Sequence, residues 1–387
     1  MRYKLQDIVD VTMGQSPKSE FYNNDGEGVP FLQGNRTFGF KYPTFDTFTT
    51  MVTKEAKAGD VIMSVRAPVG DLNITPVDIC LGRGVCSLRM KNGNQEFLYY
   101  MMKYYIPQLI NKESGTVFGS VNRNDIIELE IDIPNDAEKQ GKISRFLSML
   151  DEKIQINNKI NNNLLEQLNQ LFIEFSTRCE WNYLSIGEIA EKVAMGPFGS
   201  NIKVSTFVES GVPIISGNHL RGYFLEEQSY NYITEAHADK LKNSIVYPKD
   251  IVFTHAGNIG QVAMIPDGCE YPYYVLSQRQ FYLRCNTMMV APEYVLLFFH
   301  SKQGQHELLS YANQTGVPSI AQPASNLKKI CLPIPPISEQ KKWLLVVEPI
   351  IAMYQNNYQE TKRLSILRDT LLPKLMSGEL DVSDIDL

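Results

Sequence analysis

The sequence predicts an α+β protein in which two similar, β-rich α/β globular domains are separated by two long helices that pack as an antiparallel coiled coil. An internal repeat supports this fold class, because residues near 1–175 recur near 183–375 as the same order of parts. Each repeat closes with a long segment whose apolar residues recur about every 3.5 residues, the spacing of a coiled coil. Two related halves of this kind predict internal pseudo-two-fold symmetry.

The two closing segments share one heptad frame, in which the second seam lies 200 residues after the first. The a and d positions of the first segment are Ile143, Leu147, Leu150, Ile154, Asn157, Asn161, Leu164, Leu168, Leu171 and Phe175. Those of the second are Trp343, Val347, Ile350, Tyr354, Asn357, Thr361, Leu364, Arg368, Leu371 and Leu375. At 1.5 Å per residue, the first helix would be on the order of 55 Å long.

We assign residues 1–137 to the first globular domain and residues 177–337 to the second. Both contain short β-like runs, such as 60–65 and 250–254, separated by turn clusters. One helix is expected in each domain, near 95–109 and near 292–310. The two domains match locally: 29–35 resembles 212–218, and 59–62 resembles 249–252.

The long helices are assigned to residues 138–176 and 338–380, followed by a tail at 381–387. Asp136 can cap the first helix, and Ser338 can cap the second. Pro349 lacks a backbone donor, so we expect a kink near Glu348.

Asn157 and Asn357 interrupt the two apolar seams at equivalent points. A buried amide lowers stability but fixes the helix–helix register, because only a hydrogen-bonding partner satisfies it. Alternatively, both amides lie at a solvated crossing or contact a third chain. The sequence leaves these two interpretations open.

The bulk composition is that of an ordinary globular protein, with 43% hydrophobic and 21% charged residues. The net charge of −6 and pI near 5.6 argue against a free-standing DNA-binding protein and suggest that partner chains share in neutralising phosphate. No signal peptide or membrane-spanning run is visible, and the six cysteines show no CxxC spacing. We therefore expect a cytoplasmic location.

Motifs for catalysis are missing. The sequence contains no dinucleotide-binding GxGxxG after a strand, no phosphate-binding P-loop and no nucleophile elbow. The five histidines lack metal-ligand spacing, so no metal site is expected. These absences favour a non-catalytic protein.

Several motifs give the chain a family resemblance. They are Met13-Gly14 with its second copy Met195-Gly196, the run Gly257-Asn258-Ile259-Gly260, and the helix openings at 137–143 and 337–342. With the closing run at 371–380, the chain resembles the specificity subunit of type I restriction–modification systems. It departs from the family pattern at Lys139, which separates the usual Glu-Gln pair, and at Pro349.

The resemblance implies that each globular domain is a target recognition domain that reads one half of a bipartite, asymmetric site in double-stranded DNA. The helices would set the spacing between the half-sites and dock two methyltransferase subunits that use S-adenosylmethionine. Restriction subunits that use ATP and Mg²⁺ would join where the system includes them. This chain would bind no cofactor and no membrane.

Candidate base-reading residues lie in loops between the expected strands. Arg can read guanine, and Asn or Gln can read adenine. In the first domain the candidates are Asn35, Arg36, Lys41, Arg66 and Arg83. In the second they are Asn201, Lys203, Asn218, His219, Arg221, Asn258, Gln278 and Arg279.

Two other functions fit parts of this pattern. A coiled-coil scaffold for protein assembly would have the same helices but no DNA contact. An enzyme with two pseudo-symmetric active sites would show turnover by the purified chain. Protection of two separated short DNA sequences would distinguish the specificity subunit from both.

Overall fold

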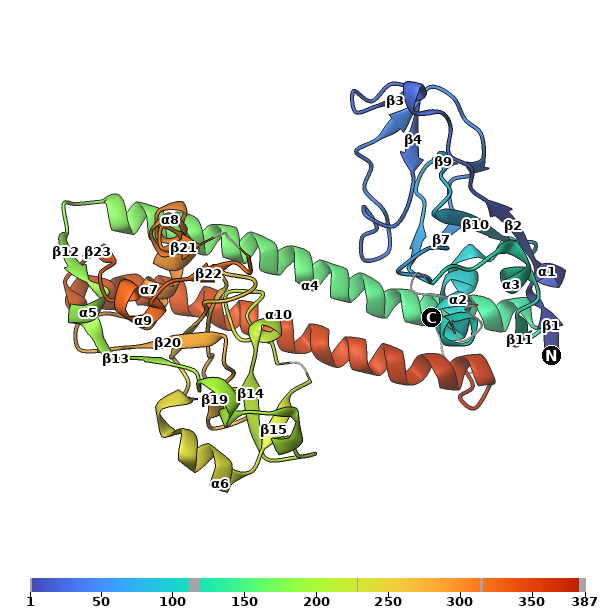
Figure 1. Ribbon diagram of the computed structural model, residues 1–387. Helices are drawn as coiled ribbons and strands as arrows, with labels where there is room; N and C mark the ends of the chain where they lie inside the picture. Colours follow the sequence, from blue (N-terminus) through green and yellow to red (C-terminus); the bar gives the residue numbers. More distant parts are fainter. Residues whose placement is uncertain (1, 111–118, 228, 314–315, 383–387) are drawn as a thin grey trace. The chain divides into compact units, whose positions relative to one another are not determined.

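The computed structural model describes residues 2–110, 119–227, 229–313 and 316–382 (Figure 1). Unit 1 comprises Met1–Ile160 and Asn356–Leu387, and unit 2 comprises Asn161–Gln355. The boundaries lie inside the two long helices, so each unit combines a β-rich globular part with a segment of each helix. Residues 383–387 of the expected tail lie outside the described part of the chain.

The globular part of unit 1 consists of short strands and helices joined by turns. Its strands are β1 (Arg2–Lys4), β2 (Val9–Met13), β3 (Tyr22–Asn23), β4 (Val29–Leu32), β5 (Phe48–Thr49), β6 (Glu55–Ala56), β7 (Val61–Ser64), β8 (Leu72–Ile74), β9 (Ile79–Leu81), β10 (Val85–Met90) and β11 (Glu130–Asp132). Its helices are α1 (Leu5–Ile8), the 3₁₀ turn η1 (Ser19–Phe21), α2 (Gln95–Ile110) and α3 (Arg123–Ile127).

Unit 2 repeats this series. Its strands are β12 (Asn182–Ser185), β13 (Ala190–Met195), β14 (Val212–Ile215), β15 (Asn231–Ile233), β16 (Ile245–Val246), β17 (Ile251–Thr254), β18 (Val262–Met264), β19 (Tyr274–Leu276), β20 (Gln280–Cys285), β21 (Ala312–Asn313), β22 (Ser319–Ile320) and β23 (Cys331–Ile334). Its helices are α5 (Ile186–Ile189), η2 (Gly199–Asn201), η3 (Val204–Thr206), η4 (Gly217–His219), α6 (Glu235–Ala238), η5 (Asp239–Ser244), α7 (Pro292–His300), α8 (Lys302–Leu309) and α9 (Pro323–Leu327).

The sequence repeat is a repeat of topology. A two-stranded antiparallel pair joins the start of each globular part to its end, β1 with β11 and β12 with β23. A four-stranded antiparallel sheet has the order β2-β10-β7-β8 in unit 1 and β13-β20-β17-β18 in unit 2. A further sheet in each unit has the order β3-β5-β4-β9-β6 or β15-β14-β19-β16 and contains one parallel pair, β4 with β9 or β14 with β19. Unit 2 also has the antiparallel pair β21 with β22. These observations confirm the predicted α+β class.

The helix that packs on the four-stranded sheet differs between the units. In unit 1, α2 is one helix, and Phe97 to Met102 are fully buried. In unit 2 the single helix expected near 292–310 is wrong, because Ser301 takes an extended conformation between α7 and α8. The Ser301 hydroxyl accepts a hydrogen bond from the Gly304 amide (3.1 Å) and so caps α8.

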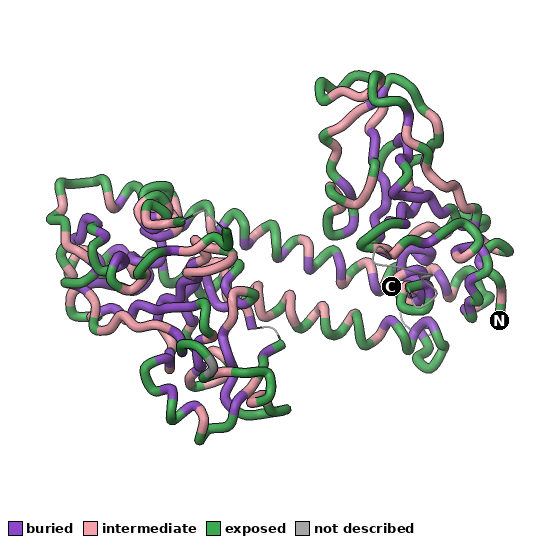
Figure 2. Tube along the Cα trace, in the orientation of Figure 1, coloured by how far each residue is buried: buried purple, intermediate pink, exposed green. Residues whose placement is uncertain are grey.

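Two 41-residue helices, α4 (Ala137–Thr177) and α10 (Ile337–Ser377), extend through both units, each on the order of 60 Å long. Figure 2 shows buried positions recurring between exposed ones along both helices. Helix α10 continues through Pro349 and ends three residues before the expected 380, where Gly378 adopts a φ of 77°. The predicted end of this helix is therefore wrong.

The two helices run antiparallel within each unit. In unit 1, Arg368 of α10 contacts Asp151 of α4 (2.7 Å), whereas Glu360, earlier on α10, contacts the later Asn157 (2.8 Å). In unit 2, the Asn161 amide donates to the Tyr354 carbonyl (3.2 Å), whereas the later Leu171 accepts from the indole of Trp343, which comes earlier on α10 (3.3 Å). In each unit, residue numbers therefore rise along α4 in the direction in which they fall along α10.

A buried glutamine fastens each long helix to its globular part. The Gln140 amide donates to the Pro134 carbonyl (2.8 Å) and accepts from Asn92 (3.0 Å). Gln340, 200 residues later, donates to the Pro335 carbonyl (2.6 Å) and accepts from the Ala291 amide (2.8 Å). Lys139, the extra residue in the first helix opening, precedes Gln140. The hydrogen bonds of the buried glutamine are therefore retained in both units.

Candidate nucleic-acid interface

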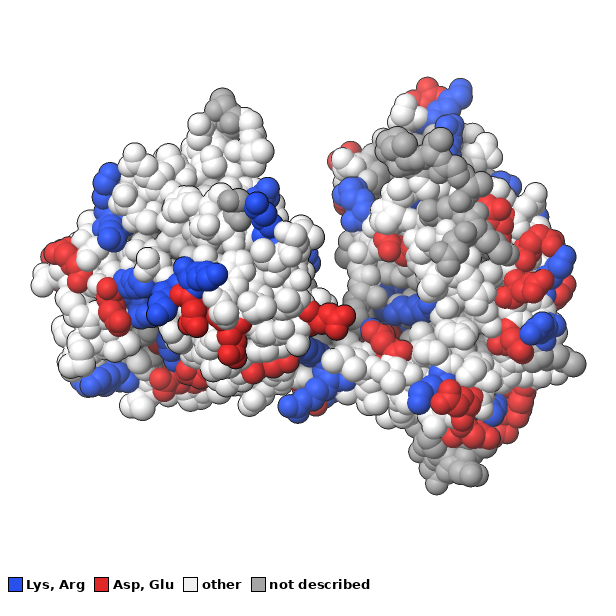
Figure 3. All heavy atoms as spheres, turned by 60° about the horizontal axis from the view of Figure 1, so that its bottom comes forward, with Lys and Arg blue, Asp and Glu red and all other residues white. Residues whose placement is uncertain are grey.

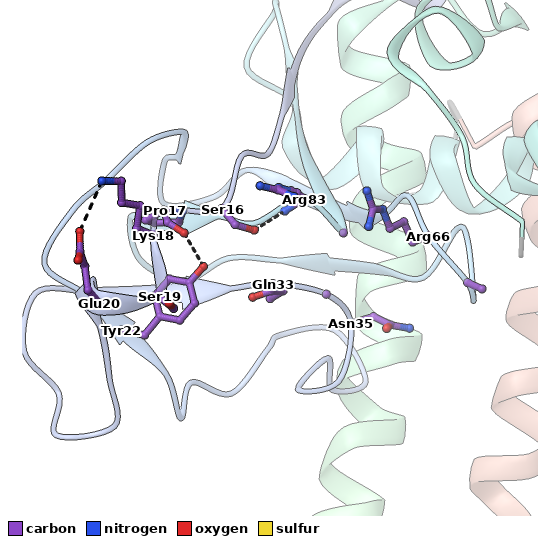
Figure 4. A pocket seen from close by; sticks show the side chains of 13 residues that line it. Ser16, Pro17, Lys18, Ser19, Glu20, Tyr22, Gln33, Asn35, Arg66 and Arg83 are labelled. Atoms are coloured by element: carbon purple, nitrogen blue, oxygen red, sulfur yellow. Dashed lines mark hydrogen bonds and ion pairs between the residues drawn. The ribbon is translucent and has the colours of Figure 1, made fainter.

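A groove of about 790 Å³ crosses unit 1 at the loops between its sheets (Figure 4). Four segments line it: the loop after β2, the loop after β4, the β7–β8 loop and the β9–β10 turn. The side chains that face it include Lys18, Gln33, Asn35, Arg66 and Arg83. Three of the five residues predicted for this domain, Asn35, Arg66 and Arg83, therefore lie together.

Hydrogen bonds hold the loops of this groove in place. The Arg83 backbone amide donates to the Ser16 hydroxyl (3.2 Å), and the Tyr22 hydroxyl donates to the Pro17 carbonyl (2.8 Å). The Arg66 and Arg83 side chains are exposed and make no ion pair with another described residue. Two guanidinium groups are thus presented on a fixed backbone.

Other predicted polar groups of unit 1 are already engaged. The Asn35 amide nitrogen donates to an Asp71 carboxylate oxygen (2.5 Å), which leaves its second N–H and its carbonyl oxygen for other partners. Arg36 pairs with Asp46 (2.7 Å), and this contact raises the pKa of Arg36 and lowers the pKa of Asp46. Arg36 lines a neighbouring groove of about 400 Å³.

Lys41 does not lie in the groove. Its side chain is 3% exposed, and its ammonium contacts Glu96 (2.8 Å) and the Ser148 hydroxyl (3.0 Å) on α4. The placement argues against the prediction that Lys41 reads bases. The sequence suggested an exposed side chain, because Lys41 lies in a polar loop. Its burial beside Glu96 depends on how this loop packs on α2 and α4.

Unit 2 has a groove of about 290 Å³ at the equivalent loops. The loop after β14 contributes Asn218, the β17–β18 loop contributes Asn258, and the β19–β20 turn contributes Arg279. These three residues were predicted separately and lie together. Gln261 also lines the groove, and its amide oxygen accepts from the Thr254 hydroxyl (3.1 Å).

The remaining predicted residues of unit 2 lie apart from this groove. Arg221 lines a separate groove of about 340 Å³ beside Gln305. Lys203 is exposed, and its backbone amide donates to Thr206. Asn201 is exposed, and its carbonyl contacts the His237 ring nitrogen (2.7 Å).

Gln278 and His219 serve local structure. The Gln278 amide donates to the Gly199 and Ile202 carbonyls and so ties the β19–β20 turn to the neighbouring loop. His219 is 4% exposed and stacks on Tyr230. Burial lowers the pKa of His219, which keeps the ring neutral. The buried placement argues against a base-reading role for His219.

An equivalent glycine, Gly14 in unit 1 and Gly196 in unit 2, lies beside the turn that lines each groove. A Cβ on Gly14 would lie 2.1 Å from the Gly82 carbonyl oxygen, and a Cβ on Gly196 would lie 2.0 Å from the Ser277 carbonyl oxygen. Each glycine therefore lets the β9–β10 or β19–β20 turn pack directly on the strand before the groove. Sequence reasoning also missed Lys18 and Gln33, although comparison of the repeated loops could have found Gln33.

Charges are mixed on the surface of both units. Figure 3 shows Lys and Arg side chains in separate groups among Asp and Glu side chains, without a continuous basic face in this view. This distribution agrees with the net charge of −6. It favours local polar contacts over a broad electrostatic attraction to phosphate.

The seam amides differ in environment. Asn157 is 1% exposed, and its amide nitrogen donates to Glu360 (2.8 Å) across the helix pair in unit 1. Lys153 also contacts Glu360 (3.1 Å), and these two contacts lower the pKa of Glu360. Asn357 is only partly buried. The assignment of both amides to register stays a prediction.

No cluster of potential metal ligands occurs in the described ranges. Within the same ranges, every helix is too short or too polar to cross a membrane.

The family model of the type I restriction modification DNA specificity domain matches residues 1–166 and again residues 179–364. The chain belongs to this family. Its two family domains coincide with the two repeats of topology, and the predicted resemblance to type I specificity subunits is confirmed.

Similar proteins agree with this membership. The type I restriction enzyme MjaIX specificity subunit of Methanocaldococcus jannaschii is 24% identical over 424 residues, which cover 99% of this chain and 94% of that protein. The putative MjaX specificity subunit of the same organism is 38% identical over 151 residues, which cover 38% of this chain and only 35% of that protein. The S subunit of a type I system from M. genitalium shares the fold, with a TM-score of 0.59 and 17% identity over 97% of this chain and 96% of that one.

Proposed function

We propose that this specificity-family chain reads a bipartite, asymmetric target in double-stranded DNA, with one half-site in the groove of each unit. The observation that carries the proposal is the pair of grooves in one chain, which share three equivalent loops but are lined by different side chains. The similar loop arrangement suits two similar ligands, and the different lining side chains suit two different DNA sequences. Base edges in the major groove of DNA present such differences to Arg, Asn and Gln side chains.

We further propose that α4 and α10 set the distance between half-sites and dock two methyltransferase subunits. Exposed apolar side chains on the helices support docking. In unit 1 they are Met149, Ile156, Ile366 and Leu367, and in unit 2 they are Ile173, Leu345, Val346 and Met353. Their presence in both units suits one partner for each unit.

The chain itself would carry out no catalytic step. The methyltransferase partners would bind S-adenosylmethionine and modify an adenine in each half-site, and restriction subunits would use ATP and Mg²⁺. This division of labour suits the mixed surface charge, because partner chains would supply part of the phosphate contacts.

Nuclease protection of DNA by the chain with its methyltransferase partner tests the proposal. We expect two short protected sequences at a constant separation, bound with an affinity that falls as salt rises. Protection of a single sequence, or equal binding to all sequences, would contradict it. A scaffold without DNA contact would give no protection, and turnover by the chain alone would indicate an enzyme.

The spacing function has a separate test. Deletion of 157–163 from α4 together with 357–363 from α10 removes one heptad from each helix and preserves both seams. This shortens each helix by about 10 Å, which corresponds to about three base pairs. We expect a shorter spacer between unchanged half-sites, whereas an unchanged spacer would refute the spacing function.

A further inference from the structure

The two grooves can be aligned residue by residue through their backbone hydrogen bonds. The Val65 amide donates to the Gly84 carbonyl (2.9 Å), and the His255 amide donates to the Arg279 carbonyl (2.9 Å). This pairs Gly84 with Arg279, and therefore Arg83 with Gln278.

Isolated bridges extend the alignment to the next loop. Arg66 bridges Ser120 in unit 1, and Ala256 bridges Ser319 in unit 2. Arg66 is therefore equivalent to Ala256, and Pro68 is equivalent to Asn258. At this loop a guanidinium in unit 1 is exchanged for an amide in unit 2.

The asparagine that follows β4 and the one that follows β14 differ in their hydrogen bonding. Asn35 and Asn218 follow Gly34 and Gly217 at the same place. In unit 1 the Asn35 amide nitrogen is bound by Asp71, but the equivalent of Asp71 in unit 2 is Gln261, which bonds Thr254 instead. The Asn218 side chain forms no hydrogen bond with the rest of the described chain.

The polar side chains that remain available for a ligand therefore differ in chemical type between the two grooves. Unit 1 presents two guanidiniums, Arg66 and Arg83, and the Gln33 amide lines the same groove (Figure 4). Unit 2 presents two amides, Asn218 and Asn258, with one guanidinium, Arg279. A guanidinium donates twice to guanine O6 and N7, whereas an amide both donates to and accepts from adenine.

We propose that the groove of unit 1 selects guanine at two positions through Arg66 and Arg83, and that the groove of unit 2 selects adenine through Asn258 and guanine through Arg279. This inference rests on the proposed DNA-reading function and specifies its base chemistry. Asn35 already donates one of its two amide N–H groups to Asp71, whereas the Asn258 side chain forms no hydrogen bond with the rest of the described chain. Gln278 is likewise engaged by the Gly199 and Ile202 carbonyls.

Sequencing of DNA retained from a random duplex library by the chain with its methyltransferase partner tests the inference. The variants are Arg66→Ala, which introduces the residue found at the equivalent position in unit 2, Arg83→Ala and Asn258→Ala. Arg123→Ala is the matched control, because Arg123 is exposed on α3 outside the groove.

Each arginine variant should lose a preference for guanine at one position of one half-site, by about 5- to 150-fold, and leave the other half-site unchanged. Asn258→Ala should weaken the preference for adenine at one position of the other half-site. The control should retain the wild-type sequence preference, and unchanged thermal unfolding would show that all variants fold.

Uniformly weaker binding to all sequences would show a phosphate contact and overturn the inference. Relaxation at a base other than guanine in the arginine variants, or no change, would also overturn it while leaving the proposed function intact. Failure of the wild-type complex to select any two-part sequence would instead overturn the proposed function.

Discussion

Replacing Arg368 by leucine removes one partner of a buried ion pair in unit 1. Asp151 of α4 has no solvent exposure, and its carboxylate contacts Arg368 of α10 (2.7 Å) and accepts from the Tyr100 hydroxyl of α2 (2.8 Å). Lys103 lies 4.0 Å away, and burial lowers the pKa of this lysine. The three groups join the globular part of unit 1 to both long helices.

Apolar side chains occupy the equivalent positions in unit 2. The helix offset of 200 pairs Asp151 with Ile351 and Arg368 with Leu168. Aligning Glu96 of α2 with Glu293 of α7 pairs Tyr100 with Leu297. All three apolar residues belong to one buried cluster. The chain therefore contains its own apolar replacement for the polar triad.

The magnitude follows from burial. An unpartnered buried charge costs about 3–5 kcal/mol, whereas replacing the whole buried set by packed apolar groups is neutral or stabilising. We expect Arg368→Leu to lower the free energy of unfolding of unit 1 by about 3 kcal/mol, since Lys103 offsets part of the lost charge. The triple variant Tyr100→Leu, Asp151→Ile, Arg368→Leu should remain within about 1 kcal/mol of the wild type.

Hydrogen exchange measured by mass spectrometry separates the two units. A loss of about 3 kcal/mol accelerates exchange through local opening by about 100-fold in peptides from 95–110 and 145–157. Both tryptophans, Trp181 and Trp343, lie in unit 2, so their fluorescence provides an internal control. A cost below about 1 kcal/mol for Arg368→Leu, or a triple variant as unstable as the single one, would refute the reasoning.

Three further changes test other parts of the chain. Burial lowers the pKa of His300 to about 4, below its ordinary value of 6.5, so the stability that its neutral form contributes is complete above pH 6.5 and is lost as pH falls toward 4. His300→Gln should therefore reduce the loss of stability between pH 7 and pH 5 by about 2 kcal/mol in urea unfolding, and an unchanged loss would contradict this cause. Asn157→Leu should raise the free energy of unfolding by about 1 kcal/mol, because the Asn157 carbonyl oxygen is buried without a partner among the described residues. A lower melting temperature of this variant would show that the hydrogen bond to Glu360 is net stabilising. Gly196→Ala should displace the β19–β20 turn, with a cost of about 1–3 kcal/mol, and weaken sequence-selective binding at the unit 2 half-site alone, as measured by library selection; equal binding at that half-site would show that the turn does not contact DNA.

The sequence by itself determined the duplication, the two long helices and the membership of a family, because periodicity and repeated motifs are local properties of the chain. The helix cap at Asp136 was also predictable, since its carboxylate accepts from the Glu138 amide (2.9 Å) only two residues away. The grouping of candidate residues in loops of equivalent order was predictable for the same reason.

The tertiary structure decided which of these residues remain unengaged. Lys41, Asn35 and Gln278 have the same polar character as Arg66 and Asn258, but residues distant in sequence bind the first three. The replacement of a polar triad around Asp151 by an apolar one around Ile351 also required packing of three elements. Charge satisfaction and burial depend on contacts between distant segments, and a single sequence records those contacts only indirectly.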